Sequence, residues 1–278
     1  MIGKIIHTAR ILSIDIAAGA CVCTLFIAQY LKVQLPFLCV LALGICVWLI
    51  YTADHLIDAW KIKHQAHSSR HYFHQKYFKT IVVIFLLLAL GSIGFLFLLP
   101  TIVVQWGILL MIFVAVYFLL MNFLKPNFLL PKELAAAILY ASGIFLAPVS
   151  LTQQPVTVSL TIVFVQFLFI AFVNLIAFSL FEKELDERDG HFSFVKQVGV
   201  QTTHRLLTGL SVLVIASTLL FIFYFPVKRP MFEVEVLLLG MSLTLLGIVS
   251  KPSVFGTHEV YRIVGDSIFF YPLVMLLF

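Results

Sequence analysis

The chain has 278 residues, of which 62% are hydrophobic and only 11% are charged. Soluble domains are about 45–50% apolar and about 25% charged, so this composition excludes a soluble domain and requires lipid as the solvent. The net charge of +5 would suggest a nucleic-acid partner in a soluble protein; in a membrane protein, basic cytoplasmic loops account for it, and we expect contact with membrane lipid and none with nucleic acid.

Nine segments are long and apolar enough to cross a bilayer, since a spanning helix needs about 20 mostly apolar residues. In chain order they are roughly residues 11–30, 34–53, 79–99, 101–120, 133–151, 157–181, 206–226, 232–250 and 261–278. The polar stretches between them leave no room for a soluble domain. We therefore expect an all-α membrane helix bundle with about nine transmembrane helices, in which residues 1–278 form a single integral membrane domain.

The basic residues fall mainly on one side of this predicted bundle. An odd number of spans places the N-terminus and the even-numbered loops together, and that side receives fifteen of the 18 Lys and Arg residues. The opposite side receives Lys32, Lys228 and Arg229. Because cytoplasmic loops are enriched in Lys and Arg, the N-terminus is predicted to be cytoplasmic. We expect a multi-pass protein of a bacterial-type inner membrane.

Acidic residues gather at the cytoplasmic ends of the second and sixth predicted spans. Asp54 and Asp58 lie just after the second span, and Glu182, Asp186 and then Asp189 lie just after the sixth. Residues four apart share a helix face, so each pair would repel unless a cation lay between its carboxylates. Carboxylates at the mouth of a bundle suit Mg²⁺, which is usually bound by one or two carboxylates together with phosphate oxygens.

The alternative for each pair is an ordinary solvated helix end. However, the chain has only 13 acidic residues, and seven of them lie in the two segments 54–58 and 182–189 on the same predicted side. This concentration favours a shared cation site over two unrelated helix ends.

The loop after the second predicted span is rich in histidine, with His64, His67, His71 and His74. Their spacing could place them on one helix face, and clusters of histidine bind transition metals. The alternative is a basic cytoplasmic loop that contacts lipid headgroups or a diphosphate.

Several polar residues lie inside predicted spans, where charged or polar groups are usually paired or functional. Asp15 in the first span is expected to face the bundle. Arg262 and Asp266, four residues apart in the ninth span, are expected to pair with each other. Asn174 lies two turns before Glu182 and could face a cavity.

These residues together resemble the UbiA superfamily of intramembrane prenyltransferases, which have nine helices and Asp-rich motifs after the second and sixth. The first family motif, NDxxDxxxD, matches residues 50–58 in its last two acids, whereas Ile50 and Tyr51 replace the Asn-Asp pair. The second motif, DxxxD, matches residues 182–186, with Glu182 for the first Asp. Between the fourth and fifth spans, Tyr117, Lys125 and Pro131 follow the family's order of Tyr, Lys and Pro.

The resemblance implies transfer of a prenyl chain from an isoprenyl diphosphate to a hydrophobic, often aromatic acceptor, with Mg²⁺ as cofactor and an active site that faces the cytoplasm. It implies catalytic and metal-binding roles for Asp54, Asp58, Glu182 and Asp186, with Asp189 as a further metal ligand. Substrate-binding roles are expected, from the resemblance or from position, for Lys61, Arg70, Lys125, Tyr51, Tyr117 and Asn174.

Two other functions stay open at the level of sequence. The replacement of the Asn-Asp pair by Ile50 and Tyr51 is compatible with a relative that binds an isoprenoid or lipid without turnover. Acidic residues at span ends, with Asp15 inside a span, are compatible with a membrane transporter. Against a transporter, most acids lie at the membrane edge and not at the midplane, where transporter sites lie.

Overall fold

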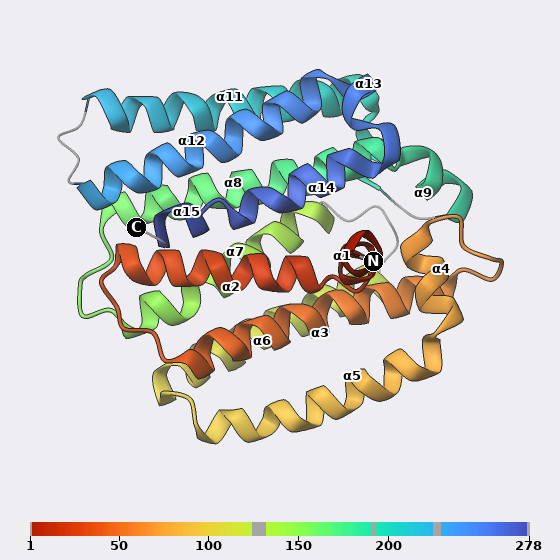
Figure 1. Ribbon diagram of the computed structural model, residues 1–278, viewed down its shortest axis with the longest axis horizontal. Helices are drawn as coiled ribbons and strands as arrows, with labels where there is room; N and C mark the ends of the chain where they lie inside the picture. Colours follow the sequence, from red (N-terminus) through yellow and green to blue (C-terminus); the bar gives the residue numbers. More distant parts are fainter. Residues whose placement is uncertain (1, 124–131, 191–192, 225–228, 277–278) are drawn as a thin grey trace.

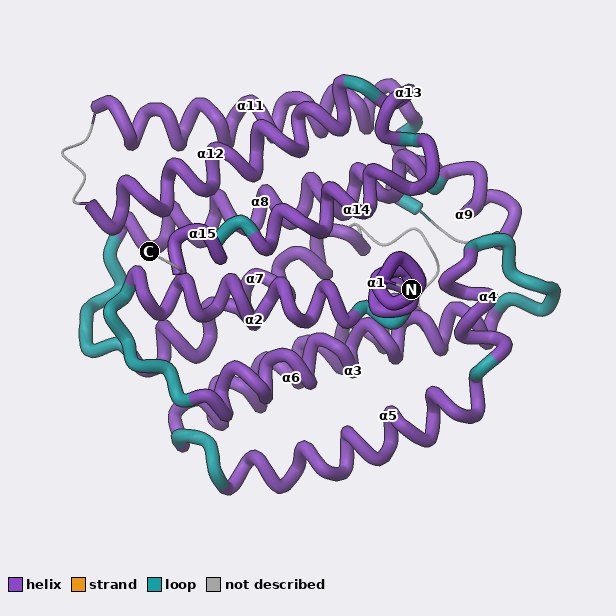
Figure 2. Tube along the Cα trace, in the orientation of Figure 1, coloured by secondary structure: helices purple, strands orange, loops and turns teal. Residues whose placement is uncertain are grey.

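The structure is a computed structural model that describes residues 2–123, 132–190, 193–224 and 229–276, and within these ranges every regular element is a helix (Figure 2). The long helices are α2 (Ile14–Tyr30), α3 (Phe37–Lys61), α5 (Phe78–Ile93), α6 (Thr101–Phe123), α7 (Lys132–Leu151), α8 (Val158–Phe181), α11 (Val200–Tyr224) and α12 (Arg229–Ser250). The short ones are α1 (Ile2–Ile11), α4 (Ser69–Lys76), η1 (Gly94–Phe97), α9 (Lys183–Asp189), α10 (Phe194–Val198), α13 (Pro252–Phe255), η2 (Thr257–Glu259), α14 (Val260–Ser267), η3 (Ile268–Phe270) and α15 (Leu273–Leu276).

Within the part of the chain that the structure describes, seven helical segments are long and apolar enough to cross a membrane: α3, α5 with η1, α6, α7, α8, α11 and α12. Their mean hydropathy lies between 2.0 and 2.7. Much of this apolar surface is exposed, above all on α5, where only Ile81 is buried. Such a surface is stable in lipid and not in water, so the chain is an integral membrane protein.

These seven segments correspond to the second to eighth predicted spans, while the first and ninth take other forms. The first is divided, because Ser13 adopts the left-handed conformation (φ 55°) between α1 and α2 and leaves α2 with 17 residues. The ninth consists of α14, η3 and α15, and Pro272, which lacks an N–H donor, precedes α15. A crossing by each of these two regions stays a prediction.

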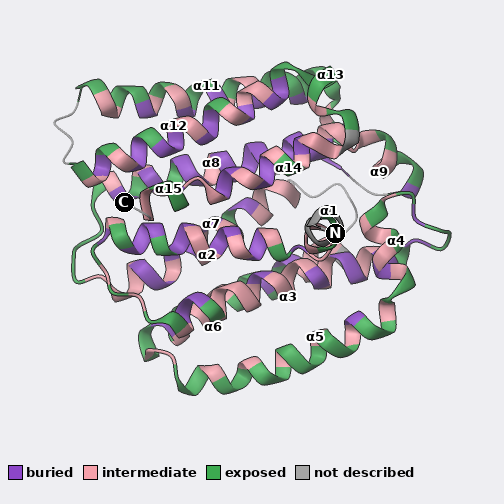
Figure 3. Cartoon of the chain, viewed as in Figure 1, coloured by how far each residue is buried: buried purple, intermediate pink, exposed green. Residues whose placement is uncertain are grey.

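The core of the bundle is built around α8, which packs against α7, α11, α12 and α14. Alanines at close helix contacts are fully buried, namely Ala20 on α2 and Ala137 and Ala141 on α7, and small residues of this kind let helices approach closely in membranes. Figure 3 shows buried residues along α2, α8 and α12 and mainly exposed ones along α5. The segment from α14 to α15 runs back along α2 and α12.

The two ends of the bundle differ. Figure 1 shows α1, α4, α9 and α13 gathered at one end, here called the α4/α9 end, while the α2–α3 and α5–α6 connections lie at the other. The described parts of the second, sixth and eighth predicted loops, which carry most of the charged residues, therefore belong to the α4/α9 end (Figure 1).

Candidate active site

A lysine from α7 lies between the two acids of α3. Because α3 stays helical to its end at Lys61, Asp54 and Asp58 share one face, as the sequence predicts. Lys132 Nζ lies 3.1 Å from Asp54 Oδ2 and 3.7 Å from Asp58 Oδ2. The Lys132, Asp54 and Asp58 side chains are 35%, 28% and 16% exposed, so solvent screens their attraction only in part. The ammonium group offsets the repulsion between the carboxylates.

Glu182, between α8 and α9, is held by α14. Its carboxylate accepts hydrogen bonds from Nε and Nη2 of Arg262, and from the Tyr261 hydroxyl at 2.8 Å. Burial raises the pKa of Glu182, but the Arg262 guanidinium and its hydrogen bonds outweigh burial and hold the pKa below its usual value. The expectation that Arg262 pairs with Asp266, four residues further along the same helix, is wrong. The Arg262 guanidinium instead makes a two-point contact with the Glu182 carboxylate at the end of α8.

Asp186 on α9 is half-buried, and within the described residues its carboxylate accepts no hydrogen bond. Burial, followed by the neighbouring Glu182 carboxylate, raises the pKa of Asp186 to about 7, although the charges of Lys132 and Lys196 oppose the shift. Lys132 therefore acts electrostatically on both acidic segments. Lys196 Nζ also donates a hydrogen bond to the main-chain oxygen of Asp186 at 3.1 Å.

A small pocket beside Glu182 collects three arginines from different helices. It is lined by His7, Arg10, Ile11, Ser68, Ser69, Arg70, Glu182, Leu185, Glu259 and Arg262. Burial, followed by the nearby Arg262, lowers the pKa of Arg70 to about 10, so that Arg70 stays charged at neutral pH. A guanidinium group can donate two parallel hydrogen bonds to phosphate oxygens, and the pocket is therefore suited to an anion.

Three of the predicted substrate-binding residues lie inside the bundle. Tyr51 on α3 is partly buried against the core, and Tyr117 on α6 is buried. Asn174 on α8 is buried, and its Oδ1 has no hydrogen-bond partner among the described residues. A buried amide oxygen without a donor is unfavourable, and this makes Asn174 suited to a polar ligand group.

The other predicted basic residues are less informative. Lys61 is exposed at the end of α3. Lys125 lies outside the described residues. Arg70 is placed in the pocket, where its Nη1 lies 3.3 Å from His55 Nε2.

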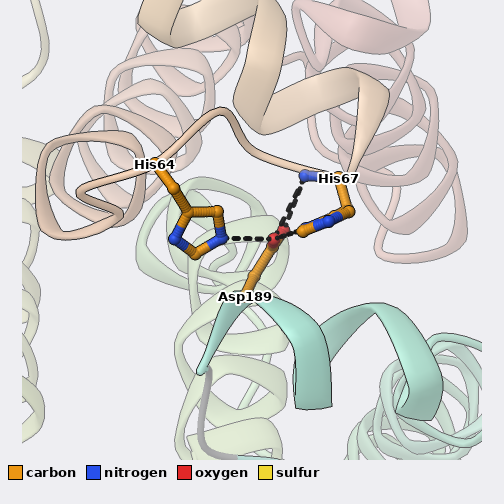
Figure 4. A group of neighbouring side chains, drawn as sticks. All are labelled: His64, His67 and Asp189. Carbon is orange, nitrogen blue, oxygen red and sulfur yellow. Dashed lines mark hydrogen bonds and ion pairs between the residues drawn. The ribbon is translucent and has the colours of Figure 1, made fainter.

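The Asp189 carboxylate contacts the loop between α3 and α4. Its Oδ1 lies 2.7 Å from His67 Nδ1 and accepts a hydrogen bond from the His67 N–H at 3.1 Å (Figure 4). Burial raises the pKa of Asp189, but the hydrogen bonds from His67 and from the Ser68 N–H outweigh it and hold the pKa below its usual value. The structure therefore groups Asp189 with histidines and not with Asp54 and Asp58.

The histidines do not share one helix face. His64 and His67 lie in the loop before α4, whereas His71 and His74 lie on α4. His74 is fully buried, with Nδ1 2.9 Å from the main-chain oxygen of Arg70.

Sequence reasoning missed the site role of Lys132, which it counted only as a basic residue. It also missed Tyr261, and it gave Arg262 a local partner. For Arg262, the available signal was a charged side chain in a predicted span, which generally needs a partner.

No family model and no curated protein matches the chain. Two solved structures of a UbiA homolog from Archaeoglobus fulgidus share its fold. The structure bound to GPP and Mg²⁺ matches with a TM-score of 0.62 and 13% identity over 96% of this chain and 99% of that one. The structure bound to DMAPP and Mg²⁺ matches with a TM-score of 0.59 and 12% identity over 96% and 98%. At this identity the likeness shows the fold.

Proposed function

We propose that the chain is a divergent member of the UbiA superfamily that transfers a prenyl group from an isoprenyl diphosphate to a hydrophobic, often aromatic acceptor, with Mg²⁺. The observation that carries the proposal is the pair of carboxylates, Asp54 and Asp58, that share the Lys132 ammonium group. The fold shared with a homolog solved with GPP and with DMAPP supports the choice of donor.

Three acids offer donor atoms of the type that Mg²⁺ binds. Asp54 and Asp58 already share one cation, the Lys132 ammonium, and Asp186 offers a half-buried carboxylate without a hydrogen-bond donor among the described residues. Hard carboxylate oxygens are the ligands that Mg²⁺ prefers. When bound, Mg²⁺ would neutralise the diphosphate and stabilise the charge that develops on it as it leaves.

Glu182 has a different role in this proposal. Arg262 and Tyr261 occupy its oxygens, so Glu182 positions the guanidinium and does not bind the metal. Of the two acids in the second motif, Asp186 would then bind the metal, and Glu182 would hold the Arg262 side chain in place. Asp189, which is turned toward the histidine loop, is likewise outside the Mg²⁺ site.

The basic residues would bind and hold the departing diphosphate. Lys132 faces the carboxylates, and Arg70 and Arg262 line the adjacent pocket. As the allylic C–O bond breaks, its electron pair passes to the diphosphate, and these fixed cations stabilise the added charge. The acceptor donates an electron pair to the same carbon and releases a proton.

The interior would protect the electron-poor carbon from water. Tyr51 and Tyr117 are at least partly buried, and the faces of aromatic rings attract cations by roughly 0.5–2 kcal/mol each. The buried Asn174 oxygen could accept a hydrogen bond from the acceptor. A polyprenyl tail is itself soluble in the bilayer, which accounts for a membrane location of such an enzyme.

We also propose that the α4/α9 end faces the cytoplasm, since fifteen of the 18 Lys and Arg residues belong to that predicted side. In a cysteine-free background, a single cysteine at exposed Lys61 would react with an impermeant thiol reagent only in inside-out vesicles. A cysteine at exposed Val156, in the α7–α8 connection, would react only in right-side-out vesicles.

The test of the reaction is diphosphate release by the purified protein in nanodiscs. The donors are DMAPP, GPP and longer prenyl diphosphates, with and without Mg²⁺ and with a panel of aromatic acceptors. We expect Mg²⁺-dependent release that is abolished in Asp54→Asn and Asp186→Asn. The matched control is Glu233→Gln on α12, where the acid is paired with Arg229 near the opposite end of the bundle.

Other outcomes would select the alternatives. Folded protein that binds prenyl diphosphates but releases no diphosphate would be a non-catalytic isoprenoid-binding relative. Protein that neither binds nor cleaves any donor, but carries a cation flux in liposomes, would be a transporter.

A further inference from the structure

The loop between α3 and α4 brings two histidines to the end of α9. Figure 4 shows His64 and His67 on either side of the Asp189 carboxylate. His64 Nε2 lies 3.5 Å and His67 Nδ1 lies 2.7 Å from Asp189 Oδ1, and one ligand atom from each residue lies within 4.8 Å of the others. We propose that His64, His67 and Asp189 form a binding site for a transition-metal ion such as Zn²⁺, separate from the Mg²⁺ site proposed at Asp54, Asp58 and Asp186.

The ligand types select the class of metal. Two imidazole nitrogens and one carboxylate oxygen suit Zn²⁺, Co²⁺ or Ni²⁺, whereas Mg²⁺ prefers oxygen ligands alone. The His64 and His67 side chains are 51% and 44% exposed, so an ion can enter from water and keep a water molecule as a further ligand. The proposed Mg²⁺ site consists of carboxylates, and the two sites therefore differ in selectivity.

The separations of the two histidines from Asp189 require only a small adjustment. Tetrahedral ligands of Zn²⁺ lie about 3.3 Å apart, given metal–ligand bonds of about 2.0–2.2 Å. The separation between His64 and Asp189 already fits this value. His67 and Asp189 are at hydrogen-bond distance and would separate by about 0.6 Å as the ion replaces the shared proton.

The loop that carries the histidines is fixed by one side chain of α4. Gln75 Nε2 donates to the main-chain oxygens of Ile62 at 3.1 Å, His64 at 3.0 Å and Ala59 at 3.3 Å. Gln75 Oε1 accepts a hydrogen bond from the Ala66 N–H at 3.0 Å. These bonds hold the backbone on both sides of His64, so little conformational entropy is lost when an ion binds.

The carboxylate is also held in place before any ion binds. The Asp189 side chain is only 1% exposed, and the N–H groups of His67 and Ser68 donate to its oxygens at 3.1 and 3.4 Å. Hydrogen bonds of this kind orient a ligand and increase metal affinity. His71 Nδ1, 3.9 Å from Asp189 Oδ2, is the nearest candidate for a fourth protein ligand.

An ion at this position would join the segment after Asp58 on α3 to the segment after Asp186 on α9. It would thereby fix the spacing of the two acid-bearing segments. Binding of the ion can be tested without any prenyl substrate, so its result is independent of the proposed reaction.

The experiment is a Co²⁺ titration of the full chain in nanodiscs, purified without a polyhistidine tag and kept in excess Mg²⁺ to block oxygen-ligand sites. We expect the visible absorption of four- or five-coordinate Co²⁺ at one ion per chain, removed by one equivalent of Zn²⁺. His64→Asn should weaken binding by about tenfold or more, since loss of outer-shell partners alone costs about 10–100-fold. The control is His204→Asn, an exposed histidine on α11.

His64→Asn is the decisive variant because it leaves the hydrogen bonds between His67 and Asp189 in place and should therefore fold. His67→Asn should weaken binding as well. Absence of the Co²⁺ spectrum in the wild type, or binding that is equal in His64→Asn, His67→Asn and the wild type, would overturn the proposal.

Discussion

Lys132 Nζ of α7 lies 3.1 Å from Asp54 Oδ2 of α3, a contact between residues 78 positions apart in the chain. The same ammonium group lies 3.7 Å from Asp58 Oδ2. Two carboxylates that would repel each other thus share a cation supplied by the protein. Where the UbiA motif that residues 50–58 resemble has an Asn-Asp pair, this chain has Ile50 and Tyr51, and the Lys132 ammonium group lies beside Asp54 and Asp58.

Replacement of Lys132 should affect Mg²⁺ binding and turnover differently. In Lys132→Met, the freed carboxylates should bind Mg²⁺ at least as tightly, because no ammonium group competes for them. Diphosphate release should fall by about 10²–10³-fold, the usual effect of removing one group that stabilises the leaving charge. Calorimetric Mg²⁺ titration and steady-state kinetics measure the two effects.

Lys132→Arg is the control, since it keeps the charge and should retain more activity than Lys132→Met. A Lys132→Met protein with weaker Mg²⁺ binding and unchanged turnover would contradict the proposed role.

The contact between Glu182 and Arg262 should stabilise the fold in a pH-dependent way. The pKa of Glu182 is lowered on folding, so its contribution is fully present above the unfolded pKa of about 4.5 and is lost as pH falls through the lower folded value. The wild type should therefore lose more thermal stability than Glu182→Gln below about pH 4.5. Scanning fluorimetry in detergent across this pH range measures the difference.

A double-mutant cycle measures the pair itself. Glu182→Gln and Arg262→Gln should couple by about 1–3 kcal/mol, as expected for contacting charged residues that are mostly shielded from solvent. Additive effects of the two substitutions would mean that the contact contributes nothing to stability.

The helical parts of the site could be predicted from the sequence, because they depend on local periodicity. Asp54 and Asp58 share a face since no residue interrupts α3 before Lys61. The Asn174 position also follows from the turn spacing of α8.

The tertiary parts could not be predicted in this way. The contacts of Lys132 with Asp54 and of Arg262 with Glu182 join helices distant in sequence, and they depend on how the bundle packs. For Arg262, the local alternative at Asp266 was the natural expectation, and only the placement of α14 against the end of α8 decides between the two partners. Asp189 likewise has its partners in a loop 122 positions away.

A buried acid at a distance from the proposed site should matter for stability. Glu235 on α12 is fully buried, and its Oε2 accepts a hydrogen bond from Gln166 Nε2 at 3.1 Å. Glu235→Ala would remove this acceptor and lower the free energy of unfolding by about 1–3 kcal/mol. Glu235→Gln, which keeps an oxygen acceptor, should be milder.

Glu233, on the same helix, is the matched control. It forms an exposed pair with Arg229, so Glu233→Ala should change the free energy of unfolding by less than about 1 kcal/mol. Denaturation in mixed micelles compares the three variants, and equal losses at positions 233 and 235 would contradict the importance of the buried contact.

Gly265 should control the placement of α14 and, through it, of Arg262. A Cβ at Gly265 would lie 2.5 Å from Asn174 Oδ1 and 2.7 Å from Phe178 Cε1, closer than side chains approach in proteins. Gly265→Ala should therefore displace α14 from α8 and destabilise the protein by about 1–3 kcal/mol. Because Arg262 lies on the same helix, the affinity for prenyl diphosphate should fall as well.

The control is Gly247→Ala on α12, where a Cβ meets no atom within 4 Å. Since Ala favours helix by about 1 kcal/mol over Gly, Gly247→Ala should be neutral or stabilising. Thermal melting and equilibrium binding of labelled GPP compare the two variants. If Gly265→Ala has the melting temperature and the GPP affinity of the wild type, close contact between α14 and α8 does not position Arg262.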